Sequence, residues 1–371
     1  MITKNTIYQN NDQLLDFVTS NFFGKKGNFL AQIFTGDSDV SKIEEICFIL
    51  KQNINNVHII GTTTSGEIMN GKNYQGQIVI SISLFEKSNI KSFLLEYSEG
   101  DENALGKAFC DTYISDEDKL LILFTDGLNT VGVNFLRYLH TRFPNLIVSG
   151  AKAGDNKKFD STFIFDGDTY VENGICGALI SGESLEVNNE YSFGWSRVGK
   201  LLTVTKSDKN RLYEIDGIIA YDFYKQSLGE EIVKNLPHIG GQFPLILKRN
   251  GVFIAREIIK RHSDGSFSLS GDVEENEKVQ IGCGQINTIL NTDKKIITKS
   301  LNGKSIESIF VYSCSGRKSF MGKYLDKEIG IFNCFGESSG FYGYGVFFHT
   351  NTYNFVLSET MTILTLSEDP I

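Results

Sequence analysis

The chain has 371 residues, of which 41% are hydrophobic and 12% aromatic, with a formal net charge of -9. These values suit a chain that buries a large core in two domains, and they exclude a disordered protein. The acidic balance and the scattered Lys and Arg argue against nucleic acid as a partner, and without a long apolar run we expect no membrane span.

Apolar periodicity in the first half alternates between the helical and the strand pattern. In chain order it predicts a helix at 12–23, a strand at 29–34, a helix around 43–50, strands at 57–60, 77–85 and 90–97, a helix capped by Asp101, a strand at 120–124, a helix around 135–139 and a strand at 146–149. This alternation predicts a sheet with a parallel part. Residues 161–205 instead have the pattern of short strands separated by turns, so we expect mixed sheets.

The second half carries a similar mixture of elements. The pattern predicts a helix after 216–217, strands at 245–248, 252–259, 267–269 and 278–281, a helix at 284–293, a strand at 307–314, a helix at 318–327, strands at 330–334 and 360–366, and a glycine-rich stretch at 336–345. The sequence therefore predicts a mixed α/β (α+β) fold of two domains, each built on mixed β-sheets flanked by helices. We divide it into a lead-in at 1–28 and domains at 29–195 and 196–371.

Cysteines and histidines show no metal-binding spacing. No two of the six cysteines lie within four residues of each other, which predicts buried free thiols and a reducing compartment. Because of this spacing we also expect no metal site. The first residues are polar and do not resemble a signal peptide, so we expect a cytoplasmic protein. The five histidines are isolated, and His349, beside an aromatic stretch, is the one candidate axial ligand for a haem.

Small polar loops follow three predicted strands of the first domain, at 61–67, 125–127 and 150–155. Ligands bind beyond the carboxyl ends of strands in open sheets, and glycine lets backbone N–H groups approach a ligand closely. The candidate ligand-binding residues in these loops are Thr64, Ser65, Glu67, Gly154 and Asp155. The alternative is that the loops are only tight turns and helix caps.

A second set of candidates lies near the end of the chain. Arg317, just past a predicted strand, could hold a carboxylate, and the glycine-rich stretch around Tyr344 could form a pocket wall or pack a buried sheet edge. Cys314, Glu359 and Thr360 complete the set. Because there is no GxSxG, Walker or GxGxxG motif in its proper context, we expect no enzyme. The alternative is thiol chemistry at Cys314.

Several segments together resemble the FIST family, which pairs an N-terminal (FIST-N) and a C-terminal (FIST-C) sensory domain. The similar segments are Gly61-Thr62-Thr63-Thr64-Ser65-Gly66-Glu67, Ser149-Gly150-Ala151-Lys152-Ala153-Gly154-Asp155, Gly194-Trp195, Tyr213-Glu214-Ile215-Asp216-Gly217, Phe243-Pro244-Leu245, Ser313-Cys314-Ser315-Gly316-Arg317 and Gly340-Phe341-Tyr342-Gly343-Tyr344-Gly345. Two positions depart from the family pattern: Val346 stands where a Glu is usual, and Ser358-Glu359-Thr360 stands where Asn-Gln-Thr is usual.

The resemblance implies a cytoplasmic signal-input protein that binds a small ligand, possibly an amino acid. Its partner would be a separate signalling protein such as a histidine kinase, a cyclic-dinucleotide enzyme or a chemotaxis receptor. From the charges we expect Arg317 to hold an anionic group and Glu67, Asp155 or Glu359 to face an amine. The alternatives are a haem and nitric oxide sensor using His349, or a ligand-independent interaction scaffold.

Overall fold

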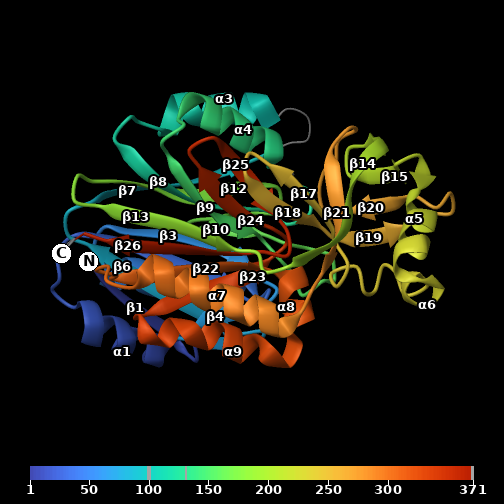
Figure 1. Cartoon of the computed structure of the whole chain (residues 1–371). Coiled ribbons are helices and arrows are strands. Elements are labelled where there is room, and N and C mark those ends of the chain that lie inside the picture. The colour runs from blue at the N-terminus through green and yellow to red at the C-terminus, as the bar shows by residue number, and fades with distance from the viewer. Residues whose placement is uncertain (98–101, 130–131, 369–371) are drawn as a thin grey trace.

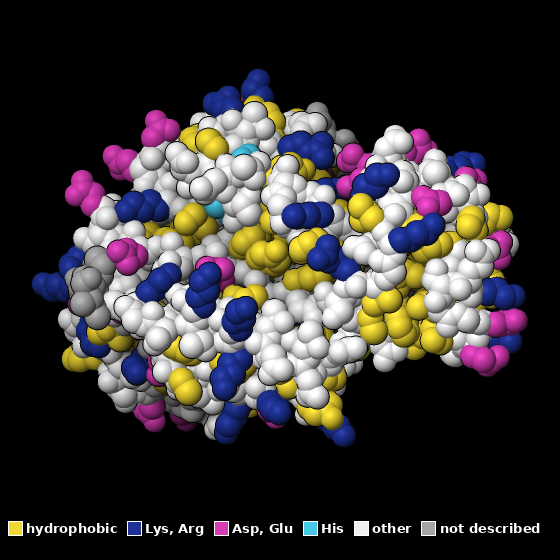
Figure 2. All heavy atoms as spheres, viewed as in Figure 1, with side chains coloured by type: hydrophobic (Ala, Val, Ile, Leu, Met, Phe, Trp, Pro, Cys, Tyr) yellow, Lys and Arg dark blue, Asp and Glu magenta, His cyan; other side chains and the backbone are white. Residues whose placement is uncertain are grey.

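The computed structural model describes residues 1–97, 102–129 and 132–368, which form two parts. Residues 196–283 form a small lobe around one sheet, and the other described residues form a main body with three six-stranded sheets. In Figure 1 the small lobe extends from one side of the main body, and Figure 2 shows a notch between them. The mixed α/β architecture predicted from the sequence is confirmed.

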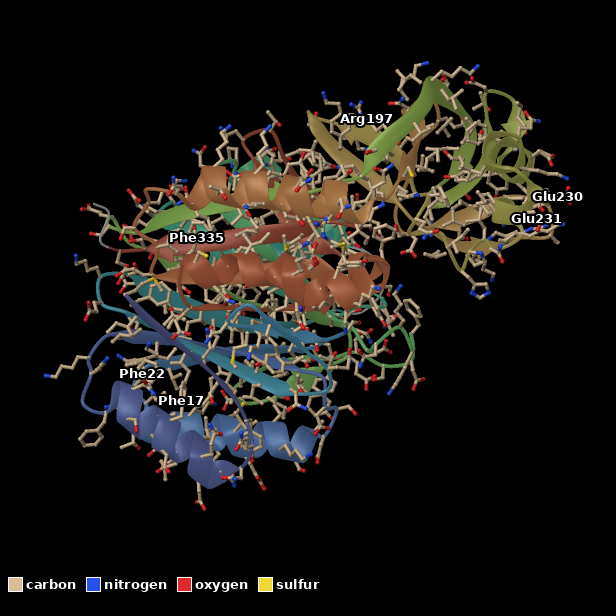
Figure 3. All side chains as sticks on the ribbon, turned by 60° about the horizontal axis from the view of Figure 1, so that its bottom comes forward. Phe17, Phe22, Arg197, Glu230, Glu231 and Phe335 are labelled. Atoms are coloured by element: carbon tan, nitrogen blue, oxygen red, sulfur yellow. The ribbon has the colours of Figure 1, made fainter. Side chains whose placement is uncertain are left out.

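The first sheet of the main body combines one parallel strand pair with antiparallel neighbours. Its strands, in spatial order, are β1 (Ile2–Ile7), β6 (Ile78–Phe85), β2 (Asn28–Thr35), β3 (Val57–Thr63), β10 (Ile164–Asp166) and β11 (Tyr170–Val171). Helices α1 (Asn11–Phe22) and α2 (Val40–Asn53) cover its outer face. The ring of Phe22 points from α1 toward this sheet, 5.7 Å from the ring of Phe29 (Figure 3).

The second sheet repeats this design around the parallel pair β8–β9. Its strands are β25 (Tyr353–Leu357), β24 (Val346–Thr350), β9 (Ile147–Lys152), β8 (Asp118–Thr125), β12 (Gly174–Ser181) and β7 (Asn89–Glu96). Helices α3 (Glu102–Tyr113) and α4 (Val133–Arg142) pack on it through apolar faces that include Phe109 and Leu136.

The third sheet is built around the parallel pair β22–β23. Its strands are β13 (Glu186–Ser192), β26 (Met361–Ser367), β22 (Ser308–Cys314), β23 (Ser338–Gly343), β4 (Glu67–Met69) and β5 (Lys72–Tyr74). The helical segments that accompany it are α7 (Ile286–Leu301), α8 (Ser315–Met321), η1 (Gly322–Tyr324), α9 (Leu325–Ile329) and η2 (Gly330–Cys334). Figure 1 shows α7 and α9 in front of this sheet.

The small lobe contains one long antiparallel sheet and two short helices. Its strands are β18 (Val252–Arg256), β17 (Leu245–Arg249), β21 (Lys278–Cys283), β14 (Ser196–Asp208), β15 (Arg211–Ile215), β20 (Phe267–Leu269) and β19 (Ile258–Arg261), with β16 (Ile218–Ile219) beside β15; its helices are α5 (Ala220–Leu228) and α6 (Glu230–Val233). Glu230 and Glu231 lie at the end of the lobe farthest from the main body (Figure 3).

Aromatic side chains join the three sheets at the centre of the main body. The ring of Phe341 lies 5.2 Å from that of Phe34 and 5.5 Å from that of Phe124, and each ring comes from a different sheet. The Tyr312 hydroxyl donates to Oε1 of Gln32 at 2.9 Å, so its polar end is satisfied inside this apolar core. The three sheets therefore share one core.

The two halves of the sequence contribute to each other's sheets. The hairpin β4–β5 from the first half pairs with β23, and the hairpin β24–β25 from the second half pairs with β9. The predicted boundary between residues 195 and 196 falls where β14 enters the small lobe, but α7 and all later elements return to the main body. The division into sequence domains stays a prediction, and two of the sheets contain strands from both sides of the predicted boundary.

Some predicted elements differ from those observed. Residues 330–334 form the 3-10 helix η2 instead of a strand, and the glycine-rich stretch contains the buried strand β23. The predicted strand at 252–259 is divided between β18 and β19, and the predicted cap Asp101 lies outside the described residues. In the part of the chain that the structure describes, no helix combines the length and apolar character needed to cross a membrane.

Substitution of Gly150 tests whether β8 and β9 need to pair closely at this position. Its φ is +136°, and a Cβ there would overlap the Leu123 carbonyl oxygen of the neighbouring strand. Gly150→Ala should therefore lower the free energy of unfolding by about 1 to 3 kcal/mol in urea denaturation. Gly330→Ala is the control, because its φ is -57° and the nearest atom, the Gly71 carbonyl oxygen, is 3.9 Å away. Equal stability of the two variants would contradict this account.

Candidate ligand-binding site

The polar turns that follow β3 and β9 meet the end of β23 at one end of the main body. The backbone N–H of Gly154 donates to the Thr63 carbonyl at 3.0 Å, and that of Ser65 donates to the Tyr342 carbonyl at 2.7 Å. A Cβ on Gly154 would overlap the Ser65 hydroxyl, so glycine permits this close approach. The structure thus brings together turns that are far apart in the sequence.

Glu67 and Thr64 form a buried pair inside this arrangement. The Thr64 hydroxyl donates to Oε1 of Glu67, and the backbone N–H of Gln77 donates to Oε2 at 3.0 Å. Burial raises the pKa of Glu67 to about 7, although these hydrogen bonds and the charge of Lys318 act in the opposite direction. Both carboxyl oxygens are used by protein donors, so Glu67 holds the turn.

Asp155 and Tyr344 organise the turn after β9. The Asp155 carboxylate accepts from the Tyr344 hydroxyl and from the backbone N–H groups of Phe159 at 3.0 Å and Asp160 at 2.7 Å. Burial acts to raise the pKa of Asp155, but these hydrogen bonds lower it overall. The Tyr344 hydroxyl accepts from the backbone N–H of Lys157 at 2.8 Å, which fixes the position of that lysine.

Arg317 requires a correction. Its side chain is fully buried, Nη2 lies 2.7 Å from Oδ1 of Asp293, and Nε lies 2.8 Å from Oε1 of Glu328. The remaining nitrogen, Nη1, donates to the carbonyls of Ser192 at 3.2 Å and Phe193 at 3.0 Å. Protein groups therefore take the hydrogen bonds that we expected a ligand carboxylate to receive, and Arg317 links α7, α8 and α9 as a structural ion-pair centre.

Cys314 and Thr360 lie beside this centre, between β22 and β26. The Cys314 backbone N–H donates to the Thr360 carbonyl at 3.0 Å, and the Thr360 hydroxyl donates to the Ser358 carbonyl at 2.7 Å. Burial, and then the neighbouring Glu359, raise the pKa of the Cys314 thiol to about 12. A reactive cysteine needs a thiolate, so this environment contradicts the alternative of thiol chemistry at Cys314.

Glu359 differs from the other candidates because its carboxyl has no protein donor. The side chain is fully buried, and among the residues that the structure describes no N–H or O–H group donates to either carboxyl oxygen; the group within hydrogen-bonding reach is the Glu257 carboxyl. Burial and then the adjacent Glu257 carboxyl raise its pKa well above the usual range. The residue also has a φ of +54°, which is unusual for a side chain other than glycine. The two carboxyl groups can hydrogen-bond to each other only through an added proton.

A hollow with a cavity volume of about 180 Å³ lies next to these carboxyls. It is lined by Lys157, His238, Ile239, Gly241, Gln242, Glu257, Gly316, Ser319 and Phe320. A neighbouring hollow of about 360 Å³ shares Lys157 and Ser319 and is lined also by Ser65, Gln75, Asn156, Ser315, Lys318, Gly322 and Leu325. We call the two together the polar hollow.

Glu359 lies at the base of the polar hollow, behind two glycines that line it. A Cβ on Gly316 would overlap Oε1 of Glu359, and a Cβ on Gly241 would lie 3.4 Å from the same oxygen. A side chain at Gly316 would therefore displace the carboxyl, whereas Gly241 lies at contact distance from it. Of the predicted residues, Ser65 lines the hollow, Glu359 lies beneath it, and the others support its walls.

The surroundings of His349 do not fit a haem. Its ring is buried on β24, where Nδ1 is 2.8 Å from Oδ1 of Asn354 and the ring of His140 is 5.9 Å away. An axial ligand needs an apolar slot beside the ring, whereas these neighbours are polar. His349 is also absent from the lining of the polar hollow. We therefore propose no haem at this position.

Sequence reasoning missed Glu257, Lys157 and Lys318. Glu257 follows β18 in an apolar stretch that was predicted as one continuous strand, and a carboxylate there was the available signal. Lys157 lies just past the predicted loop at 150–155. Lys318 donates to the Ser65 carbonyl across the polar hollow, a contact between distant segments that spacing along the chain does not reveal.

Comparison with known proteins identifies the family. The model of the FIST N domain matches residues 30–218, and the model of the FIST C domain matches residues 220–349. The chain belongs to the FIST family. FIST domains are sensory domains of signal transduction proteins that bind small ligands. In this FIST protein the N domain contributes Ser65 and Lys157 to the polar hollow, and the C domain contributes Glu257 and Gly316.

A curated relative extends the comparison. The chain is 24% identical over 314 residues to "Uncharacterized protein MJ1623" of Methanocaldococcus jannaschii, and the match covers 78% of this chain. It covers 61% of the relative, so this FIST protein spans less than two thirds of the length of that protein.

The Arg317 centre should dominate local stability. Arg317→Met keeps much of the side-chain volume but leaves the buried carboxylates of Asp293 and Glu328 without their cation, which should cost about 3 to 5 kcal/mol in chemical denaturation. Adding Asp293→Asn and Glu328→Gln should recover part of this loss. Lys234→Met, which breaks only exposed ion pairs, should change stability by less than about 1 kcal/mol. A loss no larger than that of the control would contradict the structural role.

Glu359 should make stability depend on pH. The pKa of Glu359 in the folded protein is raised above the unfolded value of about 4.3. Its contribution to the free energy of unfolding is therefore largest below that pH, and it falls by up to about 1.4 kcal/mol per pH unit as pH rises toward the raised pKa. Glu359→Gln cannot ionise. The free energy of unfolding of this variant, measured relative to that of the wild type, should therefore increase from pH 5 to pH 8. The exposed Glu186→Gln should follow the wild type, and parallel profiles for Glu359→Gln would refute the prediction.

Proposed function

We propose that this FIST protein senses a small zwitterionic compound, an amino acid, that binds in the polar hollow between the main body and the small lobe. The observation that carries the proposal is the fully buried Glu359 carboxyl, which receives no N–H or O–H donor from the described residues and lies with Glu257 at the base of a hollow that also contains Lys157. A buried polar group without a partner is costly, and a ligand that supplies the partner recovers that cost.

The charges of the polar hollow match the two ends of an amino acid. Glu257 and Glu359 provide two carboxyl groups at one end, and Lys157 and Lys318 provide positive charge along the other side. The hydroxyls of Ser65 and Ser319 lie between as adaptable hydrogen-bonding groups. In this proposal Lys157 takes the role that we first gave to Arg317, because the guanidinium is already paired with protein carboxylates.

A zwitterion fits these groups better than a metal ion or a simple anion. Among the residues described by the structure, no three His, Cys, Asp or Glu side chains are grouped to hold a metal ion. A simple anion would lie close to the two carboxyls and be repelled by them. A zwitterion satisfies both signs of charge without leaving either unpaired in a partly buried site.

The bound state would be relayed to a separate signalling protein, such as a histidine kinase, a cyclic-dinucleotide enzyme or a chemotaxis receptor. The polar hollow is lined by the loop before β17 in the small lobe and by α8 of the main body. A ligand that contacts both would restrict the small lobe relative to the main body. That difference between the two states is what a partner could recognise.

Thermal shift measurements with the standard amino acids test the proposal. An amino acid at about 100 times its dissociation constant should stabilise the protein by about 2.7 kcal/mol. Lys157→Gln should weaken its binding at least about tenfold, which corresponds to about 1.4 kcal/mol, by removing the partner of the ligand carboxylate. Lys158→Gln is the matched control, because Lys158 is exposed next to it and does not line the hollow. No stabilisation by any amino acid would rule out this function.

A further inference from the structure

Given the function proposed above, we infer that Glu257 and Glu359 form a two-carboxyl site that binds the protonated primary amine of the ligand in exchange for a proton. The site recognises an ammonium group specifically. It is shared between the two parts of the protein, because Glu257 belongs to the small lobe and Glu359 to the main body.

The two carboxyls face one common point. A Cβ placed on Gly241 would lie 3.4 Å from Oε1 of Glu359 and 3.5 Å from Oε1 of Glu257, at ordinary contact distance from both. From the other side, a Cβ on Gly316 would lie 2.9 Å from Oε2 of Glu257 and would overlap Oε1 of Glu359. A small group between the glycines can therefore contact both carboxyls at once.

The surrounding chain holds this geometry in place. The indole N–H of Trp195 donates to the Gly241 carbonyl at 3.1 Å, which fixes one glycine. The backbone N–H of Glu257 donates to the Ser270 hydroxyl at 2.9 Å, which fixes one carboxyl-bearing residue. The site is thus built by contacts that do not use the carboxyl oxygens of Glu359, and no donor among the described residues takes up those oxygens.

An ammonium group has the chemistry that these oxygens lack. It carries three N–H donors and no acceptor, so it can donate to both carboxyls and still reach a third oxygen. An N-acetylated amine loses the charge and two of the donors. A carboxylate would bring a third negative group to the pair. The site should therefore discriminate strongly for free primary amines, because buried acceptors would otherwise stay unpaired.

Proton exchange follows from the charges that face Glu359. These groups are Glu257 after β18, Lys157 after β9, Arg317 of α8 and the Cys314 thiol, while His238 lines the same hollow. In the empty site, burial and Glu257 favour the protonated Glu359 carboxyl. The incoming ammonium favours the ionised form, so the proton leaves Glu359 for solvent as the N–H donors replace it. No covalent bond forms or breaks in the ligand.

Protons and ligand therefore compete for the same site. Apparent affinity should rise with pH, by up to tenfold per unit, for as long as the empty Glu359 is protonated and the ligand amine remains charged. A sensor built in this way reports the ligand less sensitively in an acidified cell.

The experiment is calorimetric titration of the full chain with the tightest-binding standard amino acid and with its N-acetyl derivative. Titrations at one pH in buffers of different ionisation enthalpy give the number of protons released. The variants are Glu359→Gln, Glu257→Gln and Gly241→Ala, which places a methyl group between the carboxyls. Asp160→Asn removes an exposed carboxyl of the adjacent turn and is the control, and His238→Gln removes the histidine that lines the hollow.

The wild type, His238→Gln and Asp160→Asn should release up to one proton per ligand and bind the N-acetyl derivative at least a hundredfold more weakly. Glu359→Gln should release no proton, and all three site variants should lose at least tenfold in affinity while melting no lower than the wild type. Equal binding of the N-acetyl derivative, or unchanged affinity and proton release in Glu359→Gln, would overturn this inference and leave the proposed function standing. Failure of the wild type to bind any amino acid would overturn the proposed function itself.

Discussion

The Glu359 carboxyl is held away from water by a backbone that places it behind Gly241 and Gly316, and no donor from the part of the chain that the structure describes reaches it. This constraint shapes its surroundings. A side chain at Gly316 would overlap the carboxyl, and the adjacent Glu257 makes the ionised form less favourable still. Proteins rarely leave a buried polar group in this condition without a functional reason. The polar hollow above Glu359 supplies one, since it can admit the missing partner.

The rest of the fold keeps this carboxyl buried at the base of the hollow, with the Glu257 carboxyl as its neighbour. Arg317 is close enough to neutralise Glu359, but Asp293 and Glu328 hold its guanidinium instead. The Arg317 guanidinium also lies 5.4 Å from the Trp195 ring, whose N–H fixes the Gly241 carbonyl. The ion-pair centre thus supports the wall of the hollow without occupying it. Because the wall belongs partly to the small lobe, a ligand in the hollow would connect the two parts of the molecule.

Much of this could be predicted from the sequence, where local pattern carries the information. The mixed α/β fold follows from periodicity, and the resemblance to the paired FIST domains comes from motifs such as residues 61–67. The neighbours of Arg317 and Glu359 could not be predicted from the sequence, because they come from distant segments. Arg317 pairs with Asp293 of another helix, and Glu359 lies beside Glu257 of the small lobe. The glycine-rich stretch left a pocket wall and a buried sheet edge as alternatives, and in the structure its glycines allow the close strand pairing of β23.

A crystal structure of the protein with its tightest-binding amino acid tests the central claim most directly. This account places the ligand nitrogen in the polar hollow, within about 2.7 to 3.2 Å of one carboxyl oxygen from Glu257 and one from Glu359. The ligand carboxylate should lie on the side of Lys157. A ligand bound outside the polar hollow, or one whose carboxylate instead of its amine faces Glu359, would contradict the account.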